Sequence, residues 1–229
     1  MSRVIAVVEG QTEQGFVREV LAPFLSHKNV YMTAQLVGKP GHKGGDCRYE
    51  RAKRDVLALL KQEANTVVTT MFDFYALPDS WPGRAEAKAA LSARKAAIVE
   101  TAVKDDISSE LGASFDKNRF YPYIQMHEFE ALLFSEPATI CAVLRSGESE
   151  KEVESIRTSF QNPEEINDNY ETAPSKRLSK VFADYQKRLH GLIAAQRIGI
   201  GAMRRECPHF AGWVGVLESL GQGGKQQEL

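Results

Sequence analysis

Short continuous apolar runs alternate with helical periodicity over the first 135 residues of this chain. Four runs predict strands, at residues 4–8, 30–37, 67–73 and 120–126. They are rich in β-branched and aromatic residues, which is typical of strands buried on both faces of a parallel sheet. Apolar residues at helical spacing predict helices between them, at residues 12–24, 48–64 and 84–111. The pattern therefore predicts an α/β fold with a parallel sheet of about four strands flanked by helices.

Beyond residue 135 the pattern is helical and irregular. We interpret residues 1–135 as an α/β domain, residues 136–220 as a helical appendage packed on it, and residues 221–229 as a disordered polar tail. In the last helical element the side chains predicted to be core are Phe210, Trp213, Val214 and Leu217. The long helix at residues 84–111 is expected to break near Lys104.

Two of the predicted strands lead directly into a carboxylate. Glu9 follows the first strand, and Gly10 permits a tight turn into a helix for which Thr12 is a good N-cap. Asp73 ends the third strand. Because open α/β sheets bind ligands at the carboxyl ends of their strands, we expect Glu9 and Asp73 to face one crevice. Glu13, in the first helical turn, either faces the same crevice or only complements the helix dipole.

The fourth strand runs into the string His127-Glu128-Phe129-Glu130-Ala131-Leu132-Leu133-Phe134. If the chain stays extended, Glu128 and Glu130 point to one side. If a helix begins at once, His127 and Glu130 share a face. Both conformations bring metal-competent groups together beside a strand end. The alternative is an ordinary helix start, whose acids only favour the dipole.

Basic residues gather in two segments. The glycine-rich loop at residues 38–46 lacks the Gly-Lys-Ser/Thr of a P-loop, but it offers Lys39, His42 and Lys43 for contact with a phosphate backbone. Lys176 and Arg177 open a predicted helix, where free backbone N–H groups also attract phosphates. Solvated surface is the alternative for both segments. An acidic stretch at residues 148–171 precedes a basic one at residues 176–205, and such blocks either steer a partner or are solvated faces.

Composition limits the classes of protein to consider. The chain has 229 residues and three widely separated cysteines, an odd number that implies no disulfide framework and fits a reducing cytoplasm. No signal peptide or membrane-spanning run is evident. The net charge of −1 argues against an obligate nucleic-acid coat, although it allows a local basic groove. Cys207 and His209 are two candidate zinc ligands, which is short of a zinc site.

The string Val-Glu9-Gly10-Gln-Thr-Glu13 resembles the first motif of Toprim domains, particularly those of overcoming-lysogenization-type nucleases. The whole order of motifs resembles one bacterial Toprim-like family, which carries a domain-of-unknown-function label and is often encoded beside ATPases in phage-defence loci. The motifs that carry this resemblance are the first string, Asp73, the string from His127 to Phe134, Pro174-Ser175-Lys176-Arg177 and Cys207-Pro208-His209-Phe210.

The resemblance implies a cytoplasmic nuclease that uses Mg²⁺ or Mn²⁺, acts on DNA or RNA and is controlled by a co-encoded ATPase. The resemblance implies Glu9, Glu13 and Asp73 as metal ligands, and we add Glu128 and Glu130 as candidate ligands with His127 beside them as a catalytic residue. Hard divalent cations prefer such oxygen ligands. No Walker A motif occurs, so any ATP-driven step needs a separate chain.

The chain departs from the Toprim pattern at one position. The second Toprim motif is Asp-x-Asp, but Tyr75 stands where the second aspartate belongs. Glu128 or Glu130 could supply the missing ligand, and the number of metal ions stays open. The departure favours an alternative in which the chain is a catalytically weak, regulatory subunit of an ATPase complex.

Overall fold

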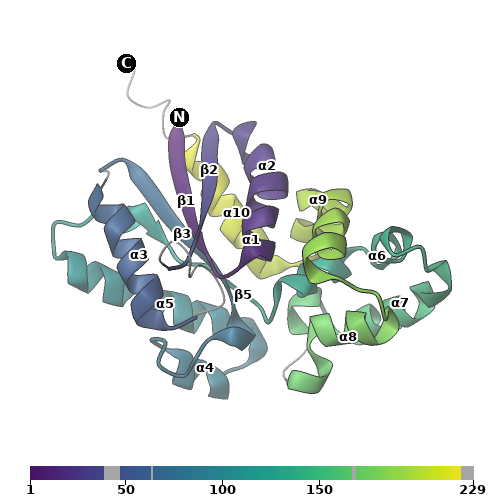
Figure 1. Ribbon diagram of the computed structural model, residues 1–229. Coiled ribbons are helices and arrows are strands. Elements are labelled where there is room, and N and C mark those ends of the chain that lie inside the picture. Colours follow the sequence, from purple (N-terminus) through teal and green to yellow (C-terminus); the bar gives the residue numbers. More distant parts are fainter. Residues whose placement is uncertain (39–46, 63, 167–168, 223–229) are drawn as a thin grey trace.

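The structure is a computed structural model that describes residues 1–38, 47–62, 64–166 and 169–222. Its strands form one parallel sheet in the order β2-β1-β3-β4, and β5 also pairs with β3 (Figure 1). The bounds are β1 Ser2–Val8, β2 Val30–Leu36, β3 Thr66–Asp73, β4 Phe120–Tyr121 and β5 Ile124–Gln125. The predicted α/β fold with a parallel sheet is therefore confirmed.

Helices cover both faces of the sheet. One face packs on α3 (Tyr49–Gln62), α4 (Arg84–Ala89) and α5 (Ser92–Leu111). The other face packs on α1 (Gln11–Phe16), a π-helical turn (Val17–Leu21), α2 (Ala22–Ser26) and the C-terminal helix α10 (Pro208–Leu220) (Figure 1). Because β3 lies between two apolar layers, all of its residues are buried, which fits the β-branched, largely uncharged sequence of the strand.

The helix predicted at residues 84–111 is divided, but not near Lys104 as expected. Ala90 and Leu91 are extended and separate α4 from α5. The division lets α4 fold back onto α5. At the contact, Gly83 has a φ of +73°, and a Cβ there would lie 2.9 Å from the carbonyl oxygen of Ile98. The contact leaves no room for a side chain at position 83, so it requires glycine there. A single straight helix would not bring these segments together.

The fourth predicted strand is also divided, into β4 and β5. Pro122 lies between them and has no N–H to donate to the ladder. The side chain of Thr70 on β3 replaces the missing pairing, because its hydroxyl donates to the carbonyl oxygen of Tyr123 and accepts from the N–H of the same residue, both at 2.9 Å. The sheet therefore continues past the proline to Gln125, beside Asp73.

Beyond β5 the chain is helical. Its elements are a long 3₁₀-helix (Phe129–Ser135), α6 (Pro137–Val143), α7 (Glu150–Thr158), α8 (Pro174–Val181), a π-helical turn (Lys187–Gly191), α9 (Leu192–Glu206) and α10, with short 3₁₀-helices at Gly147–Ser149, Pro163–Glu165 and Tyr170–Thr172. Helices α6 to α9 gather at one end of the molecule, whereas α10 runs along the sheet (Figure 1). The indole N–H of Trp213 on α10 donates to the hydroxyl of Thr69 on β3 at 2.9 Å. Phe210, Trp213, Val214 and Leu217 are buried, as predicted.

The division into domains at residue 135 stays a prediction. The core on the α10 face runs without interruption from the sheet into the helices beyond residue 135. Of the predicted disordered tail, residues 223–229 lie outside the described residues. Within the described part of the chain, no helix is both long enough and apolar enough to cross a membrane.

Candidate functional site

The carboxyl ends of β1 and β3 bring Glu9 and Asp73 together. The two strands are parallel neighbours, with Val8 opposite Met71. The backbone N–H of Asp73 donates a hydrogen bond of 3.2 Å to Oε2 of Glu9. The two acids therefore sit at one edge of the sheet, the edge where α/β proteins bind ligands.

The turn after β1 adds a third acid. Gly10 is extended and precedes α1, which begins at Gln11, so Thr12 lies inside the helix and its predicted N-cap role is wrong. Glu13 is only 4% exposed. A Cβ at position 10 would lie 2.9 Å from Oε2 of Glu13, so the carboxylate folds back over the turn because glycine leaves room for it. The buried Glu13 thus does more than complement a helix dipole at the surface.

A lysine that sequence reasoning missed reaches into this group of acids. The ammonium of Lys187 lies 2.9 Å from Oε2 of Glu130 and 3.5 Å from Oδ2 of Asp73. Glu130 is fully buried in the 3₁₀-helix after β5, and the hydroxyl of Tyr185 donates to its Oε1 at 3.4 Å. We name Glu9, Glu13, Asp73, Glu130 and Lys187 the strand-end cluster.

Burial of the carboxylates, opposed by the attraction of Lys187, dominates the electrostatics of this cluster. Burial raises the pKa of Glu13 to about 6, although the Lys187 ammonium opposes the shift. Burial likewise raises the pKa of Asp73 well above its usual value, again against Lys187 and with support from the neighbouring carboxylates. The pKa of Glu130 is raised by burial too. The three acids together hold the pKa of Lys187 above its ordinary range despite burial of the amine. The cluster is therefore short of positive charge.

Two buried oxygens of the cluster, Oδ1 of Asp73 and Oε2 of Glu130, make no hydrogen bond within the described chain, and only the second has an ion pair, with Lys187. A buried carboxylate oxygen without a partner, such as Oδ1 of Asp73, normally binds a donor, water or a cation. Within the described residues, no three His, Cys, Asp or Glu side chains are already arranged to hold a metal ion. Asp73, Glu9 and Glu13 nevertheless carry carboxylate oxygens, the type of ligand that hard divalent cations prefer.

Glu128 and His127 make their side-chain hydrogen bonds outside this cluster. Oε2 of Glu128 accepts a hydrogen bond of 2.9 Å from the backbone N–H of Ser175, so this acid caps the start of α8. The imidazole of His127 is buried, with Nε2 3.5 Å from the hydroxyl of Ser92 and its ring edge-on to Phe74. The 3₁₀-helix begins at Phe129 after an extended Glu128, which separates Glu128 from Glu130. The side chains of His127, Glu128 and Glu130 therefore bind three different parts of the protein.

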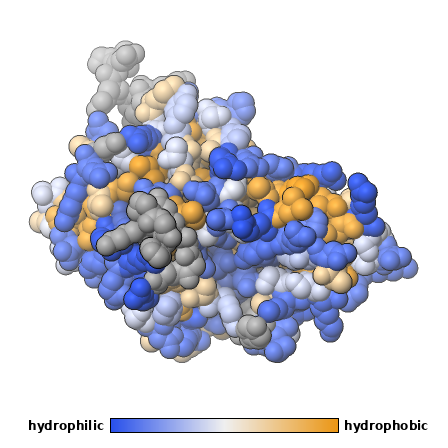
Figure 2. All heavy atoms as spheres, in the orientation of Figure 1, coloured by the Kyte–Doolittle hydropathy of each residue, from blue (hydrophilic) through white to orange (hydrophobic). Residues whose placement is uncertain are grey.

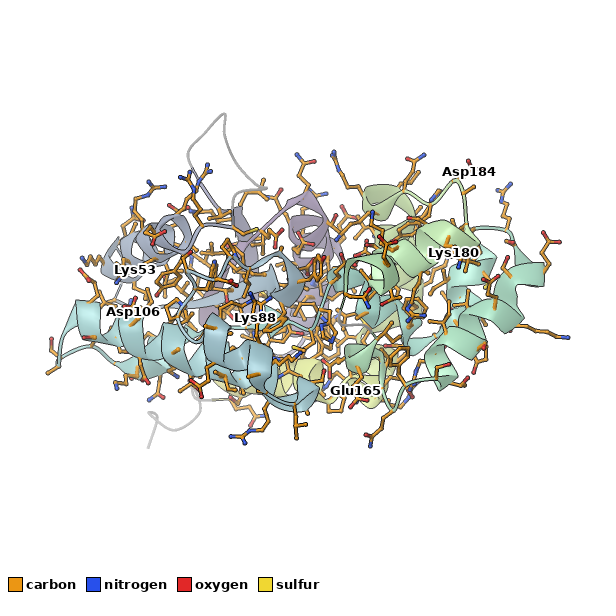
Figure 3. The ribbon with its side chains drawn as sticks, turned by 90° about the horizontal axis from the view of Figure 1, so that it is seen from below. Lys53, Lys88, Asp106, Glu165, Lys180 and Asp184 are labelled. Carbon is orange, nitrogen blue, oxygen red and sulfur yellow. The ribbon has the colours of Figure 1, made fainter. Side chains whose placement is uncertain are left out.

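The predicted phosphate contacts divide into three cases. Lys39, His42 and Lys43 lie outside the described residues. Arg177 is used internally, because its Nε donates to the carbonyl oxygen of Thr172 at 2.8 Å and its guanidinium stacks on Phe160. Lys176 is exposed on α8. Figure 3 shows Lys180 farther along the same helix, at the opposite end of the molecule from Lys53 and Asp106.

Some charged residues of the predicted acidic stretch (148–171) and basic stretch (176–205) form ion pairs or hydrogen bonds within the protein. Arg157 of the acidic stretch binds Glu206 at 2.7 Å, and Arg204 binds Glu218 at 2.9 Å. Glu164 accepts hydrogen bonds of 2.8 Å from the backbone N–H groups of His209 and Phe210. It therefore caps α10, which gives the Cys207-Pro208-His209-Phe210 motif a structural role.

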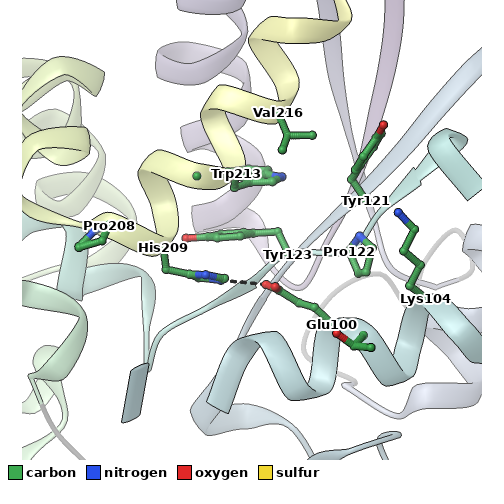
Figure 4. Close-up of a pocket in the computed structure, with 11 residues that line it drawn as sticks. Glu100, Lys104, Tyr121, Pro122, Tyr123, Pro208, His209, Trp213 and Val216 are labelled. Atoms are coloured by element: carbon green, nitrogen blue, oxygen red, sulfur yellow. Dashed lines mark hydrogen bonds and ion pairs between the residues drawn. The ribbon is translucent and has the colours of Figure 1, made fainter. Parts of the chain in front are cut away.

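A pocket of about 440 Å³ lies between α5, β4 and α10. Figure 4 shows the rings of His209, Tyr123 and Trp213 stacked at its side, with Glu100 bound to His209 at 2.8 Å. No member of the strand-end cluster lines it. Sequence reasoning did not single out Tyr123 or Glu100, whose spacing in the chain gives no sign that they meet α10.

Comparison with known proteins gives a family. A search of the curated proteins found no match. Two solved structures of the C-terminal region of the OLD protein from Xanthomonas campestris pv. campestris are similar to this chain over 94% of its length. They are 13% and 14% identical to it, with TM-scores of 0.38 and 0.37 over 97% and 95% of their own chains. The model of the family described as domain of unknown function DUF4276 matches residues 8–218, and the chain therefore belongs to this family.

Proposed function

We propose that this protein is a divalent-metal-dependent nuclease whose catalytic centre is the strand-end cluster. The observation that carries the proposal is the buried, unpartnered Oδ1 of Asp73 beside Glu9 and Glu13. Proteins seldom bury several carboxylates at a strand end without a cation to compensate them. Lys187 supplies one positive charge, which leaves the cluster net negative. A hydrated divalent cation at this edge would complete the compensation.

Glu9, Glu13 and Asp73 would hold the ion. When bound, Mg²⁺ or Mn²⁺ supplies an activated water and neutralises charge that develops on a phosphodiester. The chain's own residues fix the geometry: the N–H of Asp73 orients Glu9, and Gly10 lets Glu13 approach the turn. Glu130, which accepts a hydrogen bond from Tyr185, holds the Lys187 ammonium at the cluster, where it attracts an anionic substrate.

The substrate in this proposal is DNA or RNA. Phosphodiesters are the anions that a Toprim-like centre hydrolyses, and the resemblance of the Glu9–Glu13 motif to that of Toprim nucleases supports this choice. Lys39, His42, Lys43 and Lys176 are the proposed backbone contacts, because lysine and histidine on loops and helix starts bind phosphate oxygens. Arg177 is not among them, since its guanidinium is engaged within the protein.

We further propose that a separate ATPase controls this nuclease as part of an anti-phage defence system. The motif order resembles a family encoded beside ATPases, and no Walker A motif occurs in the chain. Figure 2 shows hydrophobic residues gathered on the surface over α9, and Leu189 just before α9 is 51% exposed. Exposed apolar patches bordered by polar residues mark protein–protein contacts. Helices α8 and α9 are therefore the proposed docking region.

A second candidate function is a regulatory subunit with little catalytic activity. Tyr75 in place of the second Asp-x-Asp carboxylate favours it, as do the ion pairs that Lys187 makes with two of the acids. In that case the cluster would be a structural network, and cleavage would belong to another chain.

Cleavage assays on matched variants distinguish the nuclease from the regulatory subunit. The purified chain, alone and with the co-encoded ATPase, is incubated with single- and double-stranded DNA and RNA in Mn²⁺ or in EDTA. Asp73→Asn should abolish Mn²⁺-dependent cleavage, whereas Asp184→Asn, at an exposed aspartate, should leave it unchanged. Equal cleavage by both variants would mean that the activity comes from elsewhere, and no cleavage by the wild type in any combination would favour the regulatory subunit.

A further inference from the structure

The two carboxylate oxygens of Asp73 have different surroundings in the strand-end cluster. Oδ2 faces the ammonium of Lys187 at 3.5 Å, and the same ammonium lies 2.9 Å from Oε2 of Glu130. Oδ1 is buried and has no hydrogen-bond partner among the described residues. Asp73 thus has one oxygen committed to a fixed cation of the protein and one that is still available.

The cluster has fewer unengaged carboxylates than a centre for two metal ions needs. A two-metal centre needs carboxylates around both ions, which lie about 3.5–4 Å apart. Position 75 carries tyrosine, and Glu128 is engaged at the start of α8. Glu130 is bound by Lys187 and Tyr185, and both partners compete with a metal for its oxygens. Glu9, Glu13 and Oδ1 of Asp73 then remain as the candidate ligands.

We propose that the centre holds a single divalent ion, on Glu9, Glu13 and Oδ1 of Asp73, and that the Lys187 ammonium takes the place of a second ion between Asp73 and Glu130. This inference rests on the proposed function, because it assigns the metal count of that site. An ammonium is a compact point charge with several donors, so it can bridge two carboxylates much as a cation does. Because Lys187 is part of the chain, its positive charge is present whether or not metal is bound.

The test is the number of Mn²⁺ ions bound by the full chain. Isothermal titration calorimetry should give one ion per wild-type chain, and electron paramagnetic resonance at saturation should show isolated Mn²⁺ without spin coupling. Lys187→Met removes the ammonium and frees Asp73 Oδ2 and Glu130 Oε2, so it should bind a second ion and show coupling between the two. Lys187→Arg keeps the charge and should bind one. Arg188→Met removes a neighbouring exposed charge and should also bind one.

Each outcome decides a separate claim. Two coupled Mn²⁺ ions in the wild type would overturn the single-ion inference but leave the proposed nuclease standing. A Lys187→Met variant that folds and still binds one ion would also overturn it, because the freed acids would then not form a site. If Lys187→Met does not fold, the wild-type and Lys187→Arg counts decide alone. Absence of any Mn²⁺ binding would overturn the proposed metal centre itself.

Discussion

The backbone N–H of Asp73 donates a hydrogen bond of 3.2 Å to Oε2 of Glu9. This bond joins the ends of two neighbouring parallel strands, so the separation of the two acids is set by the sheet rather than by flexible side chains. A site built on strand ends is held more rigidly than one built on loops. Glu9 thus has two roles, to accept this bond and to supply negative charge to a metal ion. A glutamine at position 9 could still accept the bond but could not neutralise a cation.

Glu9→Gln tests these two roles separately. The amide oxygen can still accept the bond from Asp73, so we expect the melting temperature of the metal-free protein to stay nearly unchanged. Loss of one ligand charge should reduce Mn²⁺ affinity and lower kcat/KM for cleavage by at least about 100-fold, equivalent to about 3 kcal/mol. Calorimetry and cleavage assays on the same sample measure both. Wild-type Mn²⁺ affinity in this variant would exclude Glu9 as a ligand.

Glu128→Ala distinguishes a helix cap from a metal ligand. Loss of the bond to the Ser175 N–H should lower the free energy of unfolding by about 1 kcal/mol. Mn²⁺ affinity should be unchanged, because Glu128 lies outside the strand-end cluster. Denaturant unfolding and calorimetry give the two quantities. The matched control is Glu154→Ala at an exposed site on α7, where no stability change is expected. A large loss of Mn²⁺ affinity in Glu128→Ala would return this acid to the ligand set.

Burial of Glu13 predicts a pH-dependent stability of the metal-free protein. Its pKa is about 6 in the folded state against an ordinary value of 4.5, so the folded state binds the proton more tightly than the unfolded state. The contribution of Glu13 is therefore most favourable below pH 4.5 and is lost as the pH rises through 6. The shift corresponds to about 2 kcal/mol. Glu13→Gln should gain stability relative to wild type by up to this amount between pH 4.5 and 7.

Urea unfolding of both proteins in chelator measures that difference at each pH. A stability difference that stays constant from pH 4.5 to 7 would show that Glu13 is not held in a proton-binding environment.

Charge reversal on α8 tests the proposed ATPase contact. Lys176→Glu with Lys180→Glu should weaken co-purification with the co-encoded ATPase and flatten the salt dependence of binding. Arg177 is left intact because it supports the fold. Lys61→Glu, an exposed reversal on α3, is the matched control and should not affect binding. A wild-type chain that stays monomeric beside every co-encoded protein and cleaves at full rate alone would contradict control by a partner.

The sequence predicts the sheet and the position of Glu9 and Asp73 because both depend on local patterns. Apolar runs locate the strands, parallel strands end at one edge, and the residue after each run is then placed without further information. The divided fourth strand follows less directly. Pro122 signals an interruption, but the Thr70 hydroxyl that restores pairing lies 53 residues before its partner Tyr123, and one threonine in a strand looks like any other.

The partners of the acids depend on long-range packing, which no local pattern gives. Lys187 meets Asp73 across 114 residues, and it stands among other basic residues that remain at the surface. Glu128 and Glu130 differ by two positions, yet one caps α8 and the other binds Lys187. The only sequence signal for Lys187 is physical: several acids predicted at one strand edge require a compensating cation, without indicating which one.

In the proposed function, Asp73, Glu9 and Glu13 form a divalent metal centre. The most direct measurement is an anomalous difference map from crystals of the wild-type protein saturated with Mn²⁺, beside Asp73→Asn crystals treated in the same way. We predict a Mn²⁺ peak within coordination distance of Oδ1 of Asp73 in the wild type and no peak there in the variant. A wild-type map with no peak at the ends of β1 and β3, at a Mn²⁺ concentration that supports cleavage, would contradict the account.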